Sequence, residues 1–268
     1  MSKARHIARV VAKIAAGVAV LAALGFVEKS GGSLPVRDIR VDMDQADGVH
    51  FIDGEAIKQE VLQGAGPVIG TPVGRVDETA IERHLRAIPC VAEADVYHTM
   101  DGILHVKARQ REPIIRVLNA DGSGFYIDKE GWTMPLNDNF TARVLVATGQ
   151  LAEPYANGAP VNLAEATDSL VANGHSRALY TMALTLGSDP LWKALFTQAV
   201  VEADGEITLI PAVGMARIRI GDGSHLHQRL AKLRLFYREG IPQTDWRRYA
   251  TIDLRFDDQV VCTRRTAY

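Results

Sequence analysis

The sequence predicts an α+β protein in which one membrane-spanning helix precedes two folded units. Three observations support this prediction: a single apolar run near the start, mixed helix and strand patterns after it, and basic residues concentrated at both ends of the chain. The 268 residues are 47% hydrophobic and 23% charged, which is ordinary for a globular protein and excludes a disordered or polytopic membrane protein. A net charge of −2 argues against nucleic-acid binding as the main function.

The first element expected is a transmembrane helix over residues 10–29, preceded by a cytoplasmic tail over residues 1–9. Ile14 to Val27 form a run of fourteen residues without a charge, and a helix crosses a bilayer with about 20 apolar residues. Lys13 and Arg9 lie near one end, where long cationic side chains can extend to the headgroups. Four basic residues and no acidic ones occupy the first thirteen positions. The positive-inside rule therefore predicts a cytoplasmic N-terminus and an extracytoplasmic bulk.

Two other interpretations of this run remain open. A cleaved signal peptide has the same basic start and apolar core, and Ala23-Leu24-Gly25 is an acceptable cleavage site. A buried helix of a soluble protein fits less well, because the run is apolar on all sides and lies at the chain terminus.

The first folded unit is expected over residues 36–109, after a linker over residues 30–35. Val36–Met43 alternates as a strand does, and two helices follow, capped by Asp53 and Asp77. Pro89 ends the second helix. Two strands, Val91 to Met100 and Ile103 to Arg109, are then joined by Asp101-Gly102. This dipeptide favours a hairpin with a type I′ turn, which needs a positive φ at both central residues.

This order of strand, helix, helix, strand and strand resembles a POTRA domain. The resemblance is carried by Ile39-x-Val41, by the Phe51-Ile52 step into the first helix, and by Ile88-Pro-Cys-Val91. A hairpin that ends in Arg111-Glu-Pro113 completes it. The resemblance implies a small sheet with two helices on one face and an edge strand that is available to a peptide.

The second unit is expected over residues 110–268 as a mixed α+β domain that ends in a pair of strands. Its strand signals and its helix signals alternate along the chain, and Asp204-Gly205 marks a second hairpin. The unit begins at Arg111–Leu118. Its expected strands are Phe125–Ile127, Gln198–Val201, Ile207–Ile210, Ala216–Ile220, Tyr249–Phe256 and Gln259–Arg264. The expected helices are Leu163 to Leu186, interrupted at Asn173-Gly174, and an amphipathic helix with Leu226, Leu230, Leu233 and Tyr237 on one face.

Motifs of the second unit resemble those of the bacterial cell-division family FtsQ/DivIB. At its start these are Tyr126-Ile-Asp-Lys-Glu-Gly131, Met134-Pro-Leu136 and Thr141 to Gly149. Near its end they are Lys232-Leu233, Tyr249-Ala-Thr-Ile-Asp-Leu-Arg-Phe256 and Gln259-Val-Val-Cys262. The resemblance extends over the whole chain as a cytoplasmic tail, a single span, a POTRA domain and the domain that this family calls its β domain.

The resemblance implies a non-enzymatic bitopic scaffold of the divisome. Such a protein links early and late division proteins and regulates septal peptidoglycan synthesis. It binds FtsB (DivIC) and FtsL through its periplasmic part, with the septal peptidoglycan synthase as a further partner, and it contacts inner-membrane lipid through one helix. It is expected in the inner membrane at the division septum. Two alternative functions remain open: a POTRA-containing secretion or outer-membrane assembly factor, and a membrane-anchored envelope hydrolase.

The residues do not predict catalytic chemistry, a cofactor, a metal site, a small-molecule substrate or nucleic-acid binding. His225 and His227 fall in an expected helix, where two positions apart point away from each other. Asp121–Gly124 lacks the lysine of a phosphate-binding loop, and Asp253 is expected to pair with an arginine across the strands. A disulfide between Cys90 and Cys262 would need two cysteines from different domains.

The predicted partner-binding surface is the C-terminal strand pair. Ile252, Leu254 and Phe256 are expected to form its buried face, alternating with polar residues. The last strand is a candidate open edge, and such an edge can add a strand from a partner. Arg264 and Arg265 suit an acidic segment, and the resemblance implies an FtsB contact here. The predicted residues are Thr251, Asp253, Arg255, Gln259, Val260, Val261, Cys262, Thr263, Arg264 and Arg265. A closing strand whose arginines only protect it from aggregation is the alternative.

Overall fold

The two helices of the first unit begin at capped residues. The computed structural model describes residues 13, 16–18, 33–64, 66–138, 140–153, 160–163, 165, 174–240 and 246–265. The Asp53 carboxylate accepts a hydrogen bond from Ala56 N at 2.8 Å. The Asp77 carboxylate accepts one from Ala80 N at 2.9 Å. Each cap satisfies a backbone donor that the first turn of a helix leaves free. Both predicted helix starts are therefore confirmed.

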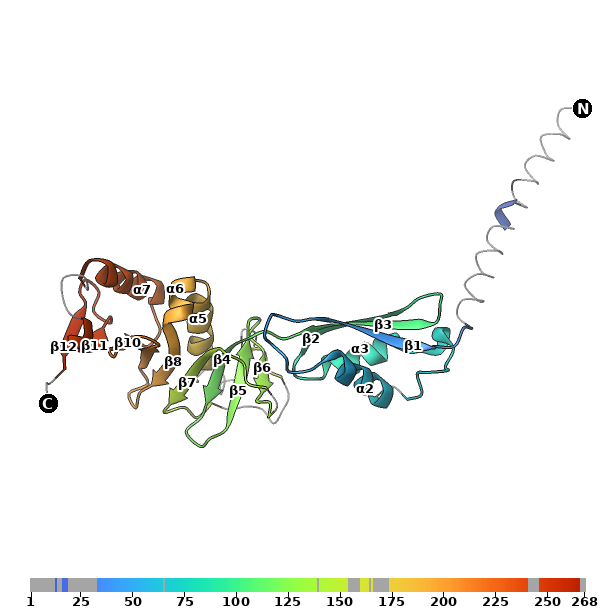
Figure 1. Cartoon of the computed structure of the whole chain (residues 1–268), viewed down its shortest axis with the longest axis horizontal. Coiled ribbons are helices and arrows are strands. Elements are labelled where there is room, and N and C mark those ends of the chain that lie inside the picture. The colour runs from blue at the N-terminus through green and yellow to red at the C-terminus, as the bar shows by residue number, and fades with distance from the viewer. Residues whose placement is uncertain are drawn as a thin grey trace, which may run out of the picture. The chain divides into compact units, whose positions relative to one another are not determined.

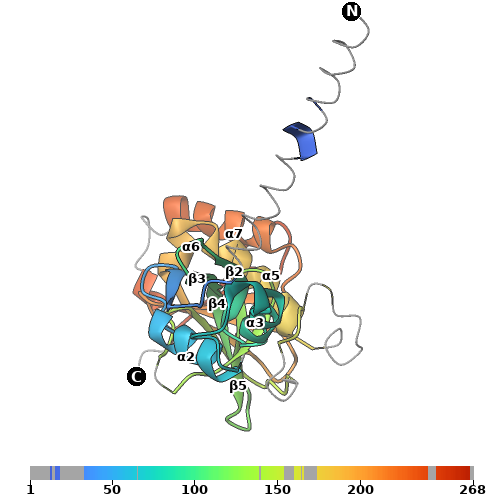
Figure 2. The same cartoon turned by 90° about the vertical axis from the view of Figure 1, so that its right-hand side faces the viewer.

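The first unit is a three-stranded sheet with two helices on one face (Figures 1 and 2). The strand order is β1-β3-β2, with β1 parallel and β2 antiparallel to the central strand β3. Ile57 and Leu85 from the helices are fully buried in one core with Leu104 and Val106 of β3. The elements are β1 (Asp38–Asp44), α2 (Gly54–Gly64), η1 (Val73–Arg75), α3 (Glu78–Arg86), β2 (Val91–His98) and β3 (Ile103–Gln110).

The second unit contains a nine-stranded mixed sheet in the order β12-β11-β10-β9-β8-β7-β4-β5-β6. Three neighbouring pairs are parallel: β4 with β7, β7 with β8, and β10 with β11. The strands are β4 (Pro113–Leu118), β5 (Gly124–Asp128), β6 (Thr133–Pro135), β7 (Leu145–Gly149), β8 (Phe196–Val201), β9 (Ile207–Pro211), β10 (Arg217–Gly221), β11 (Tyr249–Asp253) and β12 (Val261–Arg264).

Helices cover one face of this sheet (Figure 1). Helix α5 (Ser176–Gly187) buries Leu179 and Met182 against strand residues such as Leu209. Helix α7 (Leu226–Leu235) buries Leu230 and Leu233 in the same core. The helical segments are α5 (Ser176–Gly187), α6 (Pro190–Leu195), α7 (Leu226–Leu235), the π-helical turn η2 (Phe236–Gly240) and the short η4 (Trp246–Arg248). The mixed α+β class that the sequence predicts is confirmed for the residues that the structure describes.

The chain divides into two compact units that do not follow the sequence order throughout. One unit is Met1–Gln45 with Ile52–Gln110, and the other is Ala46–Phe51 with Arg111–Tyr268. The Phe51 ring lies edge-on to Tyr126 and Phe140, with ring centroids 5.4 and 4.9 Å apart. The short loop Ala46–Phe51 thus belongs by its contacts to the aromatic core of the second unit.

The hairpin at Asp101-Gly102 does not have the type I′ turn that the sequence predicts. Gly102 has a φ of 80°, whereas Asp101 is not among the residues with positive φ. Thr99 N donates to Ile103 O at 3.0 Å and Gly102 N donates to Thr99 O at 3.1 Å. The loop is therefore three residues long, with only its glycine in the left-handed region. The hairpin is confirmed and its turn type was wrong.

Three further predictions about elements need correction. The helix expected from Leu163 begins only at Ser176 in the described part of the chain, with Leu163 in a turn and residues 166–173 outside the described set. Helix α6, capped by Asp189 through Leu191 N, was not predicted. Strand β11 ends at Asp253, and Phe256 is 44% exposed, so the expected buried face does not extend to that residue.

The predicted span over residues 10–29 lies almost entirely outside the described residues. Lys13 and Ala16 to Val18 alone are described there, and they are helical. Within the portion of the chain that the structure covers, none of the helices has the length and apolar character needed to cross a bilayer.

Candidate partner-binding edge

Strand β12 lies at one end of the nine-stranded sheet, and no described strand lies beyond it. It pairs with β11 in an antiparallel register that places Val261 opposite Asp253 and Thr263 opposite Thr251. The red C-terminal end of the ribbon in Figure 1 shows this position. Since a strand carries hydrogen-bonding groups on both of its sides, pairing with β11 leaves the other side of β12 able to accept a further strand.

The side chains of β12 make this edge basic and partly apolar. Thr263, Arg264 and Arg265 are exposed, and Val261 is 39% exposed. The half-buried Cys262 packs against the core, and burial raises the pKa of its thiol. An approaching strand would therefore meet an apolar side chain and two guanidinium groups.

An exposed apolar loop lies beside the end of this edge. The Arg265 Nη1 donates to Met215 Sδ at 2.9 Å. Met215 is 59% exposed and Val213 is 66% exposed, and both lie in the connection between β9 and β10. These residues were not predicted from the sequence, although apolar residues on both sides of Gly214 in a connection between strands are a signal that could have found them.

Asp253 at the end of β11 forms an ion pair with Arg255. Arg255 Nη2 donates to Asp253 Oδ2 at 2.6 Å, and Arg255 Nη1 contacts Glu206 Oε2 at 2.5 Å. Burial opposes ionisation of Asp253, but hydrogen bonds from the Arg255 side chain and backbone outweigh it, so the pKa of this carboxyl lies below its usual range. The hydrogen bond to Asp253 also raises the pKa of Arg255. The hydrogen-bonded partner of Asp253 is thus Arg255 of its own segment, and Arg219, which lies opposite Asp253 on the neighbouring strand β10, also lowers the pKa of this carboxyl.

Lys232 fixes the chain between β11 and β12 from the helical side. Its Nζ donates to Leu254 O at 2.9 Å and to Phe256 O. A charged donor that satisfies two backbone carbonyls holds this connection where it leaves the sheet. The sequence analysis named Lys232 only as part of a family motif, and no local pattern predicts a contact with residues more than twenty positions away.

The structure brings the ten predicted partner-binding residues to the same end of the sheet, but gives them different environments. Thr251 is half-buried on β11, and Asp253 is buried. Gln259 is exposed and Val260 half-buried just before β12, while Arg264 and Arg265 project at its end. A chain that approached this edge would therefore meet β12 and its flanks, while Asp253 and Arg255 lie behind them on the neighbouring strand.

The residues set aside for other chemistry occupy structural positions. His225 caps α7 with a φ of 52°, and His227 is exposed in its first turn. In the described ranges of the chain, His, Cys, Asp and Glu form no cluster of three or more that could hold a metal ion. Cys90 and Cys262 are not joined by a disulfide. Asp121 accepts hydrogen bonds from Ser123 N and Oγ within its own turn.

Comparison with known proteins matches both units to described families. A family model described as FtsQ/DivIB, C-terminal related, matches residues 112–263, and a POTRA-like domain model matches residues 36–109. A similar protein named Cell division protein FtsQ from Rhodothermus marinus is 28% identical over 196 residues, which cover 72% of this chain and 67% of the relative. A protein of the same name from Salinibacter ruber is 25% identical over 269 residues, covering 97% of this chain and 95% of the relative.

Proposed function

The chain belongs to the FtsQ/DivIB family, and from this premise we propose that it is a non-enzymatic scaffold of the bacterial divisome. Membership of a family whose relatives are named for cell division supports a role in division. In the proposed role the protein links early and late division proteins and regulates septal peptidoglycan synthesis through binding. The open edge of β12 is the single observation that carries a binding function, because it offers a ready attachment for another chain.

The proposed partners are FtsB (DivIC) and FtsL, with a strand of the former adding to β12. Backbone hydrogen bonds along β12 would supply attachment, and the alternating side chains would supply selection. Arg264 and Arg265 favour an acidic partner segment, while Val261 and the neighbouring Met215 favour an apolar residue beside it. Charge complementarity of this kind raises the association rate and excludes basic competitors.

Two adjacent proline variants test the edge. Consecutive residues of a strand direct their N–H groups to opposite sides, so Val261→Pro and Cys262→Pro remove one donor facing outward and one facing β11. We expect the variant that loses the outward-facing N–H to abolish binding of purified FtsB–FtsL by the full chain. The circular dichroism spectrum of this variant should stay unchanged. Arg264→Glu should weaken binding and reduce its salt dependence.

A surface change in the first unit serves as the control. Arg75→Glu makes the same change of charge at an exposed position and should leave affinity unaltered. If a folded Arg264→Glu protein and both proline variants bind the partner as well as the wild type does, β12 is only a closing strand with protective arginines, and the binding surface lies elsewhere.

The proposed location is the inner membrane at the division septum, with residues 10–29 as the retained anchor. The support is the four basic residues that precede a single apolar run. We expect alkaline phosphatase fused after Tyr268 to be active, because that enzyme needs an extracytoplasmic, oxidising location. A fusion that works only with a cytoplasmic reporter, or a mature N-terminus near Phe26, would contradict this topology.

A further inference from the structure

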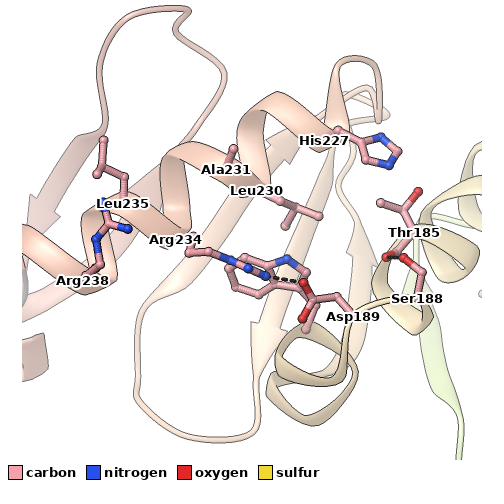
Figure 3. A pocket seen from close by; sticks show the side chains of 10 residues that line it. Thr185, Ser188, Asp189, His227, Leu230, Ala231, Arg234, Leu235 and Arg238 are labelled. Carbon is pink, nitrogen blue, oxygen red and sulfur yellow. Dashed lines mark hydrogen bonds and ion pairs between the residues drawn. The ribbon is translucent and has the colours of Figure 1, made fainter.

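The outer side of the helical layer in the second unit carries a groove. One wall is the end of α5 and the start of α6, with Thr185, Ser188 and Asp189, and the other wall is α7 with its π-helical extension η2. The cavity between them has a volume of about 520 Å³. Figure 3 shows Arg234 of one wall and Asp189 of the other pointing toward each other across it. The groove shares no residue with the β12 edge.

An arginine packed on a tryptophan forms the centre of the groove. Trp192 is only 4% exposed, and the Arg234 guanidinium lies over its ring at 5.3 Å from the centroid. Arg234 Nη2 also pairs with Asp189, as the dashed line in Figure 3 marks. A guanidinium has five N–H donors, so Asp189 leaves several of them for an incoming carboxylate. Tryptophan and arginine are the residues most enriched where binding energy concentrates.

Apolar side chains extend along the groove beside this centre. Leu230 is buried at its base, while Ala231 and Leu235 are exposed, the latter by 47%. These positions offer apolar contact over about one and a half turns of α7. A groove between helices that combines apolar side chains with flanking polar and charged ones matches the mode in which an amphipathic helix lies in a groove.

The wall made by α7 and η2 presents two arginines to the groove, Arg234 and Arg238. Arg229 and Lys232 of the same helix do not line the groove, because they bind Asp222 and the carbonyls of Leu254 and Phe256. The acidic residue of this segment is Glu239. Glu239 pairs with Arg238, but both side chains are more than 60% exposed, and such surface pairs contribute little. On the other wall Asp189 is the acid that lines the groove. The charge of this surface therefore favours an acidic occupant over a basic or neutral one.

We propose that this groove binds an acidic amphipathic helix of a partner protein. Apolar side chains spaced at i, i+3, i+4 and i+7 enter between α5–α6 and α7, where they contact Ala231, Leu230 and Leu235. Carboxylates that flank the apolar stripe meet Arg234 and Arg238. This surface is additional to the strand-binding edge, and a partner with both a helix and a strand could use the two surfaces together.

Site-specific photo-crosslinking in dividing cells tests the proposal with the full chain. A photoreactive benzoylphenylalanine replaces Leu235 in one strain and Leu191 in a control strain, because Leu191 is equally exposed at 48% but does not line the groove. We expect residue 235 to crosslink to an acidic helical segment that mass spectrometry identifies by sequence. Residue 191 should not capture this segment. No crosslink at 235, the same products from both positions, or capture of a basic or non-helical segment would overturn the proposal.

A synthetic peptide that copies the crosslinked segment then measures affinity by fluorescence anisotropy. Arg234→Glu and Leu235→Asp should each weaken binding by about tenfold or more, whereas Lys193→Glu, the same change of charge outside the groove lining, and Leu191→Asp should not. Unchanged affinity in folded Arg234→Glu and Leu235→Asp proteins would refute the proposal.

A third crosslinker in place of Val261 separates this proposal from the strand-binding edge. Crosslinks from 261 without any from 235 would leave the edge standing and remove the groove. Crosslinks from 235 to an acidic helix without any from 261 would support the groove and remove the strand-binding edge.

Discussion

Lys232 is a single side chain that joins the helical layer to the edge of the sheet. Its ammonium satisfies the carbonyls of Leu254 and Phe256, and Lys232→Met keeps the alkyl stem while removing both hydrogen bonds. The loss of a charged hydrogen bond costs about 1.5–3 kcal/mol, and here it falls on the connection into β12. We expect faster amide hydrogen exchange over Val261–Arg264, weaker partner binding and a Tm that is lower by several degrees.

A matched variant distinguishes positioning from general stability. Lys193→Met removes a lysine from the exposed surface of α6 and should alter neither exchange in β12 nor affinity. Equal exchange rates and equal affinity in Lys232→Met would show that Lys232 only tethers a surface loop and does not prepare the edge for binding.

What single residues reveal in the sequence depends on the range of their contacts. Asp53 and Asp77 were recognisable as helix caps because each bonds a backbone N–H three residues ahead. The roles of Glu206 with Arg255 and of Arg111 with Asp128 were not recognisable. These pairs join residues that are distant in sequence, at 2.5 and 2.9 Å, and only the folded sheet brings them together.

At the scale of elements, the sequence predicted the hairpins through their Asp-Gly pairs but not the geometry of the turns. Three connections share one pattern, in which the N–H of the glycine donates to the carbonyl of the residue three positions earlier: Gly102 to Thr99, Gly122 to Asn119, and Gly205 to Glu202. The three glycines have φ values between 80° and 87°. A three-residue loop needs one left-handed residue, whereas a type I′ turn needs two, and the Asp-Gly pair alone does not separate them.

Alanine substitutions at these glycines should reveal two separate costs. A Cβ at Gly122 would meet nothing within 4 Å, so Gly122→Ala should cost only the left-handed backbone penalty of about 1–2 kcal/mol. A Cβ at Gly102 would lie 2.7 Å from Pro35 O, so Gly102→Ala should destabilise its unit by more. Chemical denaturation of each unit measures both changes.

Gly187 at the end of α5 provides the control for this series. It has no neighbour within 4 Å and no positive φ, so Gly187→Ala should be neutral or stabilising by up to about 1 kcal/mol. If Gly122→Ala leaves the free energy of unfolding unchanged, the left-handed backbone has no cost there. If Gly102→Ala and Gly122→Ala lower the free energy of unfolding equally, the contact with Pro35 O adds no cost at Gly102.

Elements whose signals compete with tertiary contacts were predicted less well. The alternation of Ile252, Leu254 and Phe256 indicated one continuous strand, yet β11 ends at Asp253. Lys232 binds the carbonyls of Leu254 and Phe256 there, so these groups are engaged by a side chain and not by a neighbouring strand. Helix α6 is only six residues long, which is too short for a periodic pattern to distinguish it from a loop.

At the scale of the whole molecule, the sequence contained enough to identify the family and the class of fold. Ordered motifs such as Ile88-Pro-Cys-Val91 and Ile252-Asp-Leu-Arg-Phe256 combine local patterns in a fixed order, and such an ordered set is far more specific than any one pattern. The position of β12 at the edge of the described sheet agrees with the open edge that the sequence predicts. The groove between α5, α6 and α7 did not, because its walls include a helix that was not predicted.

The two units are expected to fold semi-independently, and a buried charge in the first unit tests this. Leu85 on α3 is fully buried in the core of that unit. Leu85→Asp places an unpaired carboxylate among apolar side chains at a cost of several kcal/mol, comparable to the stability of a small domain. We expect the amide signals of residues 36–109 to collapse to unfolded positions, while those of β12 keep their native positions and the chain still binds FtsB–FtsL. Thr79→Asp introduces the same side chain on the exposed face of α3 and should leave both sets of signals native. If Leu85→Asp also collapses the amide signals of β12 to unfolded positions and abolishes partner binding, the second unit depends on the first for its fold. The strand-binding edge then forms only when both units are folded.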